Sequence, residues 1–144
     1  MLPFGGGEDI ESFLNIDYFD NSGRELYLII DSDKHLGNEE KQKHRAEIFK
    51  KKPKSNSYVI FRSCIENYYH PRAFERVYKL PDNTFGYIKA EDDARCYIKS
   101  VVAAKDLKNI KEKNNFSVFA EMSEAEWKEV VESELVNFLS SILS

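Results

Sequence analysis

The stretch Leu26-Tyr27-Leu28-Ile29-Ile30-Asp31-Ser32-Asp33 decides the fold that this sequence predicts. Its five leading apolar residues form a run that is too short for a typical helix, which is typical of a buried central strand. Residues 57–61 form a second short run, rich in β-branched and aromatic side chains, and predict another strand. Between them, residues 38–52 are mostly helix formers with few apolar positions, and predict a surface helix that ends before Pro53.

Other segments extend this alternation along the chain. Residues 2–4 predict a strand that runs into Gly5-Gly6-Gly7 and then a short helix over residues 8–14. A further helix is expected from Pro71, because proline suits the first turn, and a longer one over residues 90–111. Strands that alternate with helices imply a parallel sheet with helices packed on it.

The last predicted helix, residues 123–143, has the clearest signals. Ser123 and Glu126 have the spacing of a capping box, in which each side chain satisfies a free backbone donor of the other residue. Apolar residues then repeat at helical spacing, which predicts one amphipathic helix. We therefore expect residues 1–144 to form a single α/β domain with a central, mostly parallel sheet flanked by helices.

Composition excludes several classes of protein. The chain has 144 residues, 42% of them hydrophobic, which is enough to bury a core. No apolar run approaches the ~20 residues of a membrane span, and the first residues lack the pattern of a signal peptide, so we expect no membrane and a cytoplasmic protein. Cys64 and Cys96 stand alone, and His35, His44 and His70 lack metal-ligand spacing. We expect reduced, buried thiols and ordinary surface or helix-start histidines.

The net charge of −4 hides an uneven distribution. Residues 34–54 contain eight basic and three acidic side chains, whereas residues 121–134 contain six glutamates and one lysine. A basic helix can follow the phosphates of DNA, with an affinity that falls as salt rises. A solvated helix face explains the same lysines, and both interpretations stay open.

Acidic residues follow the two predicted strands. Asp31 and Asp33 come directly after the first, and on an extended strand end positions i and i+2 point the same way. Glu66 falls beyond the end of the second strand, at the same edge of the sheet. Three carboxylates in one place would suit a hard cation, so Asp31, Asp33 and Glu66 are predicted ligands of Mg²⁺ or Mn²⁺.

Two segments resemble a known family. The run Leu28-Ile29-Ile30-Asp31-Ser32-Asp33-Lys34, followed by Ile65-Glu66-Asn67-Tyr68, is similar to the Toprim domain of the overcoming-lysogenisation-defect (OLD) family of ATP-dependent endonucleases. The start of the chain, Pro3-Phe4-Gly5-Gly6-Gly7 with Ile10 and Phe13, and residues 119–126 resemble other parts of that domain. Nearly the whole chain is covered, and the first two segments are the distinctive ones.

The resemblance implies a Rossmann-like fold and metal-dependent cleavage of DNA. Asp31, Asp33 and Glu66 match the family's acidic metal ligands, and Lys99 resembles a lysine that stabilises the transition state. A bound Mg²⁺ or Mn²⁺ would activate water and neutralise phosphate charge. An ATPase domain or subunit upstream and a homodimer are the implied protein partners.

The chain departs from the family at its start. Toprim domains carry a glutamate after their first strand, upstream of the glycine turn, and this residue has no counterpart here. The sequence also lacks the Gly-x-x-x-x-Gly-Lys-Ser/Thr motif of the ATPase. Glu8 and Glu11 lie on the wrong side of the turn to replace the glutamate. We therefore expect a fragment or a shortened gene product with weak metal binding and little or no cleavage by itself.

Two alternatives come from other functional classes. A haloacid-dehalogenase-like phosphatase would use Asp31 as nucleophile and Asp33 as general acid, with Glu91-Asp92-Asp93 as later metal ligands. It fits less well, because Lys34-His35 stands where a small hydroxyl or aliphatic residue is expected and the chain lacks a cap. The other alternative is a Toprim remnant without catalysis that contacts DNA or dimerises.

Overall fold

Two parallel strands and the helices around them make up the described part of the chain, which in this computed structural model comprises residues 23–104 and 115–143. The class is α/β, as predicted. Among these residues the elements follow in the order β1 (Leu26–Ile30), the 3₁₀ turn η2 (Lys34–Leu36), α2 (Glu39–Lys50), β2 (Ser55–Val59), the 3₁₀ turn η3 (Ile65–Tyr68), α3 (Pro71–Tyr78), α4 (Ala94–Ala104), α5 (Asn115–Glu121), α6 (Glu124–Val130) and α7 (Ser133–Leu143).

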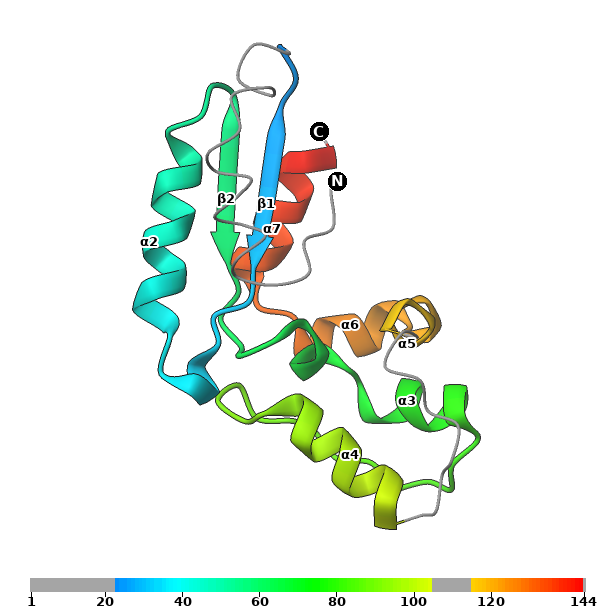
Figure 1. Ribbon diagram of the computed structural model, residues 1–144. Helices are drawn as coiled ribbons and strands as arrows, with labels where there is room; N and C mark the ends of the chain where they lie inside the picture. Colours follow the sequence, from blue (N-terminus) through cyan, green and yellow to red (C-terminus); the bar gives the residue numbers. More distant parts are fainter. Residues whose placement is uncertain (1–22, 105–114, 144) are drawn as a thin grey trace.

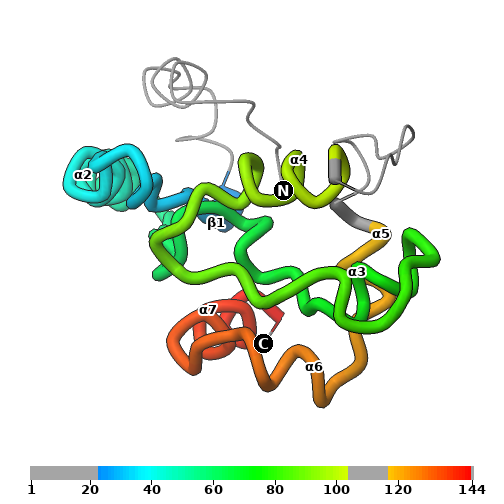
Figure 2. The backbone as a smooth tube through the Cα atoms, turned by 90° about the horizontal axis from the view of Figure 1, so that it is seen from below, coloured from blue at the N-terminus to red at the C-terminus, as the bar shows by residue number. Residues whose placement is uncertain are grey.

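The β1–β2 sheet is covered on both faces, which explains why β1 is apolar throughout. The strands are parallel, with Leu28 opposite Ser57 and Ile29 opposite Tyr58. Because successive side chains alternate, Leu28 packs toward α2 while Ile29 packs on the other side. There Phe138 of α7 stacks on Tyr58, with ring centroids 5.3 Å apart. Figures 1 and 2 show α2 and α7 on opposite sides of the strands.

Helices α3 to α6 form a second packed group, and the carboxyl ends of both strands point toward it (Figure 1). Its core includes aromatic pairs: Phe74 and Phe85 stack with ring centroids 3.9 Å apart, and the ring centroids of Tyr69 and Phe119 are 5.0 Å apart. The buried members of this core are Tyr69, Ala73, Phe74, Phe85, Ile88, Ala94, Val118, Met122 and Val130. The sheet edge therefore meets a well-packed helical group.

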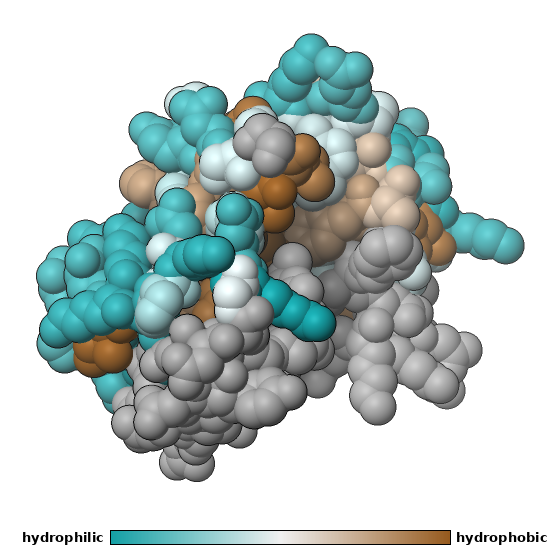
Figure 3. All heavy atoms as spheres, turned by 90° about the horizontal axis from the view of Figure 1, so that it is seen from above, coloured by the Kyte–Doolittle hydropathy of each residue, from teal (hydrophilic) through white to brown (hydrophobic). Residues whose placement is uncertain are grey.

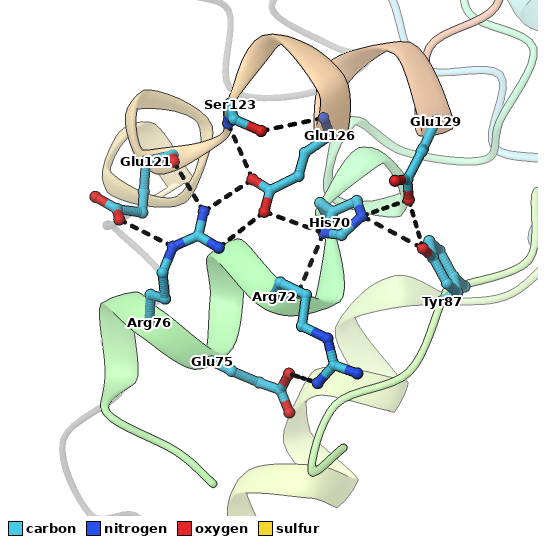
Figure 4. A network of polar contacts seen from close by, with 9 residues as sticks. All are labelled: His70, Arg72, Glu75, Arg76, Tyr87, Glu121, Ser123, Glu126 and Glu129. Carbon is cyan, nitrogen blue, oxygen red and sulfur yellow. Dashed lines mark hydrogen bonds and ion pairs between the residues drawn. The ribbon is translucent and has the colours of Figure 1, made fainter. Parts of the chain in front are cut away.

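A polar network ties α3 to α5 and α6 on the surface of that group (Figure 4). Arg76 of α3 donates two hydrogen bonds of 2.8 Å to the Glu126 carboxylate and one of 3.0 Å to Glu121. His70 is buried at the start of α3, where its Nδ1 accepts from the Arg72 backbone N–H. Its Nε2 lies 2.7 Å from Glu129. The helix-start position of His70 was predicted, but its burial was not.

The single closing helix predicted over residues 123–143 is wrong. The capping box is present, with Glu126 N donating to Ser123 Oγ and Ser123 N donating to the Glu126 carboxylate. Yet Val131 is extended, so α6 ends there and α7 begins two residues later. The two halves bury their apolar residues in different places: Val130 in the helical core and Leu135 beneath the sheet.

Smaller differences concern element bounds. β2 spans Ser55–Val59 and not residues 57–61, because its register follows β1 from Leu26 onward. α4 begins at Ala94 and not at residue 90, since the Asp93 carboxylate accepts from Cys96 N and so caps the helix. The predicted strand over residues 2–4, the helix over 8–14 and the end of the helix beyond residue 104 lie outside the described residues.

On the face that Figure 3 shows, apolar side chains gather in the middle, with hydrophilic ones above them and to the sides. Every helix in residues 23–104 and 115–143 is too short or too polar to cross a membrane.

We predict that Phe138→Ala lowers the free energy of unfolding by about 3 kcal/mol, because it empties an aromatic site against both strands. Phe138 is 8% exposed. Leu143→Ala, on the same helix but at a residue that is 87% exposed, should change it by less than about 0.5 kcal/mol. Urea unfolding followed by circular dichroism measures both, and equal effects would contradict the placement of α7.

We also predict that Glu126 stabilises the fold and that this stabilisation is lost in acid. The hydrogen bonds from Arg76 lower the pKa of Glu126 from 4.5 to about 2. A lowered acid pKa stabilises the fold above pH 4.5, and the effect is lost as pH falls through 2. Glu126→Gln should cost about 1 kcal/mol at neutral pH, a value reduced by the partial exposure of Arg76.

Urea unfolding between pH 2 and 7 checks this prediction. The difference between wild type and Glu126→Gln should shrink toward zero at the acid end. Glu124→Gln, on the same helix and 84% exposed, is the matched control and should show little change. A difference that stays constant with pH would contradict the assignment.

Candidate metal centre

The candidate site lies where both strands end, at the edge onto which Figure 2 looks. Hydrogen bonds join the segments after the strands: Asp33 N donates to Ser63 O at 2.9 Å, and His35 N donates to Ser63 Oγ at 3.1 Å. Ser32 Oγ donates to Arg62 O at 2.7 Å. Ser32 and Ser63 are fully buried. Short, buried hydroxyls let the two turns pack closely, which brings the side chains of both turns together.

Asp31 is the most perturbed carboxylate of the site. Its Oδ1 accepts a hydrogen bond of 3.1 Å from Ile65 N, which joins the end of β1 to η3. Burial, together with the negative charges of Glu66 and Asp33, raises the pKa of Asp31 from 3.8 to about 6. The Ile65 hydrogen bond and the Arg95 charge oppose this rise. Asp31 therefore keeps its proton to a higher pH than an ordinary aspartate does.

Glu66 meets Asp31 as the sequence predicted. It lies in η3, is 8% exposed, and has Arg95 Nε 3.8 Å from its Oε1. Ligand atoms of Asp31, Glu66 and Cys64 all lie within 4.8 Å of one another. One divalent ion could contact this set after small side-chain rotations.

Asp33 belongs to a different group. Its backbone is left-handed, with φ 50° and ψ 37°, so the extended strand has already ended and the i, i+2 rule no longer holds. Its Oδ2 accepts a hydrogen bond of 2.7 Å from Gln42 Nε2 of α2. Its ligand atoms fall within 4.8 Å of those of His35 and Cys64. The two aspartates thus enter two groups that share the Cys64 thiol.

Lys99, the predicted catalytic lysine, is exposed on α4. Arg95 lies four residues before it, one helical turn away and therefore on the same side of α4. Its guanidinium approaches Glu66, as described above. Sequence reasoning missed Arg95, because nothing in its immediate neighbourhood marks it as a residue of the strand ends.

Cys64 and His35 were also missed as site residues. Cys64 is buried, as predicted, whereas Cys96 is exposed, so the prediction of two buried thiols is wrong for Cys96. Burial and the nearby carboxylates raise the pKa of Cys64 to about 12, so that its thiol is neutral without a metal. The available signal was positional: Cys64 and His35 each stand two residues from a predicted ligand, on the turns that follow the strands.

The basic helix is partly neutralised within itself. Lys43 pairs with Glu39 and Glu40 at 3.3 Å, and Lys50 pairs with Glu47 at 3.3 Å. Lys54, after the helix, donates to a backbone carbonyl. The cations that could contact phosphate are therefore fewer than the composition suggests.

No protein-family model, curated protein or solved structure matches this chain. The likeness to the Toprim domain therefore rests on its motifs and stays a prediction. The function of the strand ends therefore has to follow from the residues that lie there and from their contacts.

We predict that Asp31→Asn stabilises the metal-free protein above pH 6. A raised acid pKa favours folding below pH 4, and this contribution is lost as pH rises through 6. The free energy of unfolding of the variant should therefore exceed that of wild type by up to about 2 kcal/mol at pH 7, and the two should be equal near pH 4. Its side-chain oxygen can still accept from Ile65 N.

Urea unfolding in EDTA across pH 4 to 7 measures this difference. Asp82→Asn, at an exposed loop position, serves as the control and should follow wild type. A stability gap that does not vary with pH would show that Asp31 does not titrate as its surroundings require.

Proposed function

We propose that this chain is a Toprim-type, divalent-metal-dependent nuclease domain that hydrolyses DNA phosphodiesters. The observation that carries the proposal is the meeting of the Asp31 and Glu66 carboxylates at the carboxyl end of a parallel sheet, with ligand atoms within 4.8 Å. Open α/β sheets bind ligands at this end of the strands. A buried pair of like charges is costly unless a proton or a cation lies between them.

The donor set is compatible with Mg²⁺ or Mn²⁺. Asp31 and Glu66 would hold the ion through carboxylate oxygens, which these hard cations prefer. Such an ion supplies a more acidic bound water and neutralises charge on the phosphate. Asp33, in this proposal, lies at the margin of the site and contributes negative charge.

Cations beside the site suit a phosphate substrate. The Arg95 side chain is 66% exposed and stands beside Glu66. Lys34, next to Asp33, lies 3.6 Å above the ring of Phe61 and pairs with Glu39 at 4.0 Å, so it is less available. Arg95 supports an anionic substrate such as DNA, with Lys99 farther along the face of α4. An ATPase partner and a second copy of the chain belong to the proposal through the family resemblance alone.

Manganese binding tests the site. Titration of the metal-free chain, followed by calorimetry, should show weak binding that Asp31→Asn and Glu66→Gln each reduce by more than about tenfold. Asp82→Asn should bind like wild type. Binding that is unaffected by Asp31→Asn would remove the proposed ligand set.

Plasmid nicking tests the activity. At saturating Mn²⁺ we expect slow conversion of supercoiled plasmid to the open circle, which EDTA and Asp31→Asn abolish. Arg95→Ala should slow nicking without weakening Mn²⁺ binding to the same extent, because the guanidinium is assigned to phosphate. Absence of metal-dependent nicking, with the metal bound, would exclude the nuclease activity of this chain.

A further inference from the structure

We infer that Asp33, His35 and Cys64 form a binding group for a borderline divalent ion, of which Zn²⁺ is the type, beside the Asp31–Glu66 carboxylate pair. The inference does not rest on the proposed nuclease activity, since it concerns different side chains and a different class of metal. Metal binding can be measured without DNA.

The geometry of the group carries the inference. One atom from each side chain, a carboxylate oxygen, a ring nitrogen and the thiol sulfur, lies within 4.8 Å of the other two. Tetrahedral zinc holds its sulfur and nitrogen ligands at about 2.0 to 2.3 Å. Side-chain rotations that move the three ligand atoms by about an ångström would therefore bring them all within bonding distance of one ion.

The backbone already holds these three residues in place. His35 lies in η2, and Asp33 directly precedes this turn. Cys64 directly precedes η3. Two of the hydrogen bonds that join the segments after the strands, from Asp33 N and from His35 N, end on Ser63, the neighbour of Cys64. The ligands come from two segments about 30 residues apart in sequence, yet the turns that carry them are bonded directly to each other, so little ordering remains for binding.

The side chains are available in a way that suits ligation. His35 Nδ1 is buried and, within the described residues, has no hydrogen-bond partner, which is costly for a polar atom unless a ligand satisfies it. Gln42 binds Oδ2 of Asp33 and orients the carboxylate, as outer-shell partners of metal ligands do. Asp33 and His35 are half-buried, so an ion can enter from solvent, whereas Cys64 is only 3% exposed.

The mixed donor set selects the class of ion. A thiolate and an imidazole favour Zn²⁺ over Mg²⁺, which prefers six oxygen ligands. Binding would release the thiol proton of Cys64 to solvent, and the sulfur would then bind as thiolate. Three protein ligands leave a fourth position for water.

Cobalt provides the test, because its absorption reports both sulfur ligation and coordination number. Titration of the metal-free full chain with Co²⁺ under reducing conditions should give a sulfur-to-cobalt charge-transfer band and visible bands of tetrahedral intensity. One equivalent of Zn²⁺ should abolish them. Cys64→Ser should lose the charge-transfer band, whereas Cys96→Ser, which changes the exposed thiol, should keep it.

Histidine variants provide a second test that does not disturb the buried thiol. His35→Ala should weaken Zn²⁺ binding, measured by competition with a chromogenic chelator, by more than about tenfold. His44→Ala, at an exposed position of α2, should bind like wild type. Circular dichroism of each metal-free variant verifies that it folds.

The outcomes separate this inference from the proposed nuclease. Cobalt spectra without a charge-transfer band, a band that survives Cys64→Ser, or His35→Ala binding like wild type would overturn the inference. Manganese binding that is insensitive to Asp31→Asn would overturn the proposed nuclease site and leave the zinc group standing.

Discussion

Arg62 lies just after β2, and its guanidinium group binds three other segments. Its Nε donates to Glu132 at 2.9 Å, and its Nη1 donates to the backbone oxygens of Asn67 and Ile88, at 3.3 and 3.2 Å. Glu132 stands between α6 and α7, Asn67 lies in η3, and Ile88 precedes α4. Both charged side chains are about 20% exposed, so water screens the pair poorly. Removing either side chain would leave the other charge partly buried without a partner, which is costly.

The candidate site depends on this arrangement. Arg62 and Asn67 together hold η3 against the strand ends: the Asn67 side chain accepts from Cys64 N at 2.9 Å and donates to the carbonyls of Lys89 and Asp92. Cys64 and Glu66 therefore face Asp31 in a fixed position. Polar bonds between segments distant in sequence therefore support the place where the side chains of η3 meet Asp31.

The same ion pair lies at the break between α6 and α7, which the sequence did not predict. Apolar spacing over residues 123–143 suits one amphipathic helix, since Trp127, Val131, Leu135 and Phe138 follow one another at intervals of three or four residues. In the structure Glu132 turns toward Arg62 while Val130 and Leu135 enter different cores. Periodicity reports which residues are buried, but it does not report whether they are buried against the same surface.

The sequence by itself determined the strands, the helix between them and the place of the acidic residues at their ends. These features depend on local properties: apolar runs too short for helices, helix formers before a proline, and polar residues that stop a strand. The sequence also predicted that Asp31 and Glu66 lie at one edge of the sheet, because the carboxyl ends of parallel strands lie on the same side.

Only the tertiary structure decided which side chains lie together at the strand ends. The left-handed backbone of Asp33 turns its carboxylate toward His35, and the contact between η2 and η3 places Cys64 between the two groups. These positions follow from hydrogen bonds between residues about 30 apart in the chain, such as Asp33 with Ser63. Spacing along a sequence cannot encode such contacts, because they depend on how two turns pack and not on either turn alone.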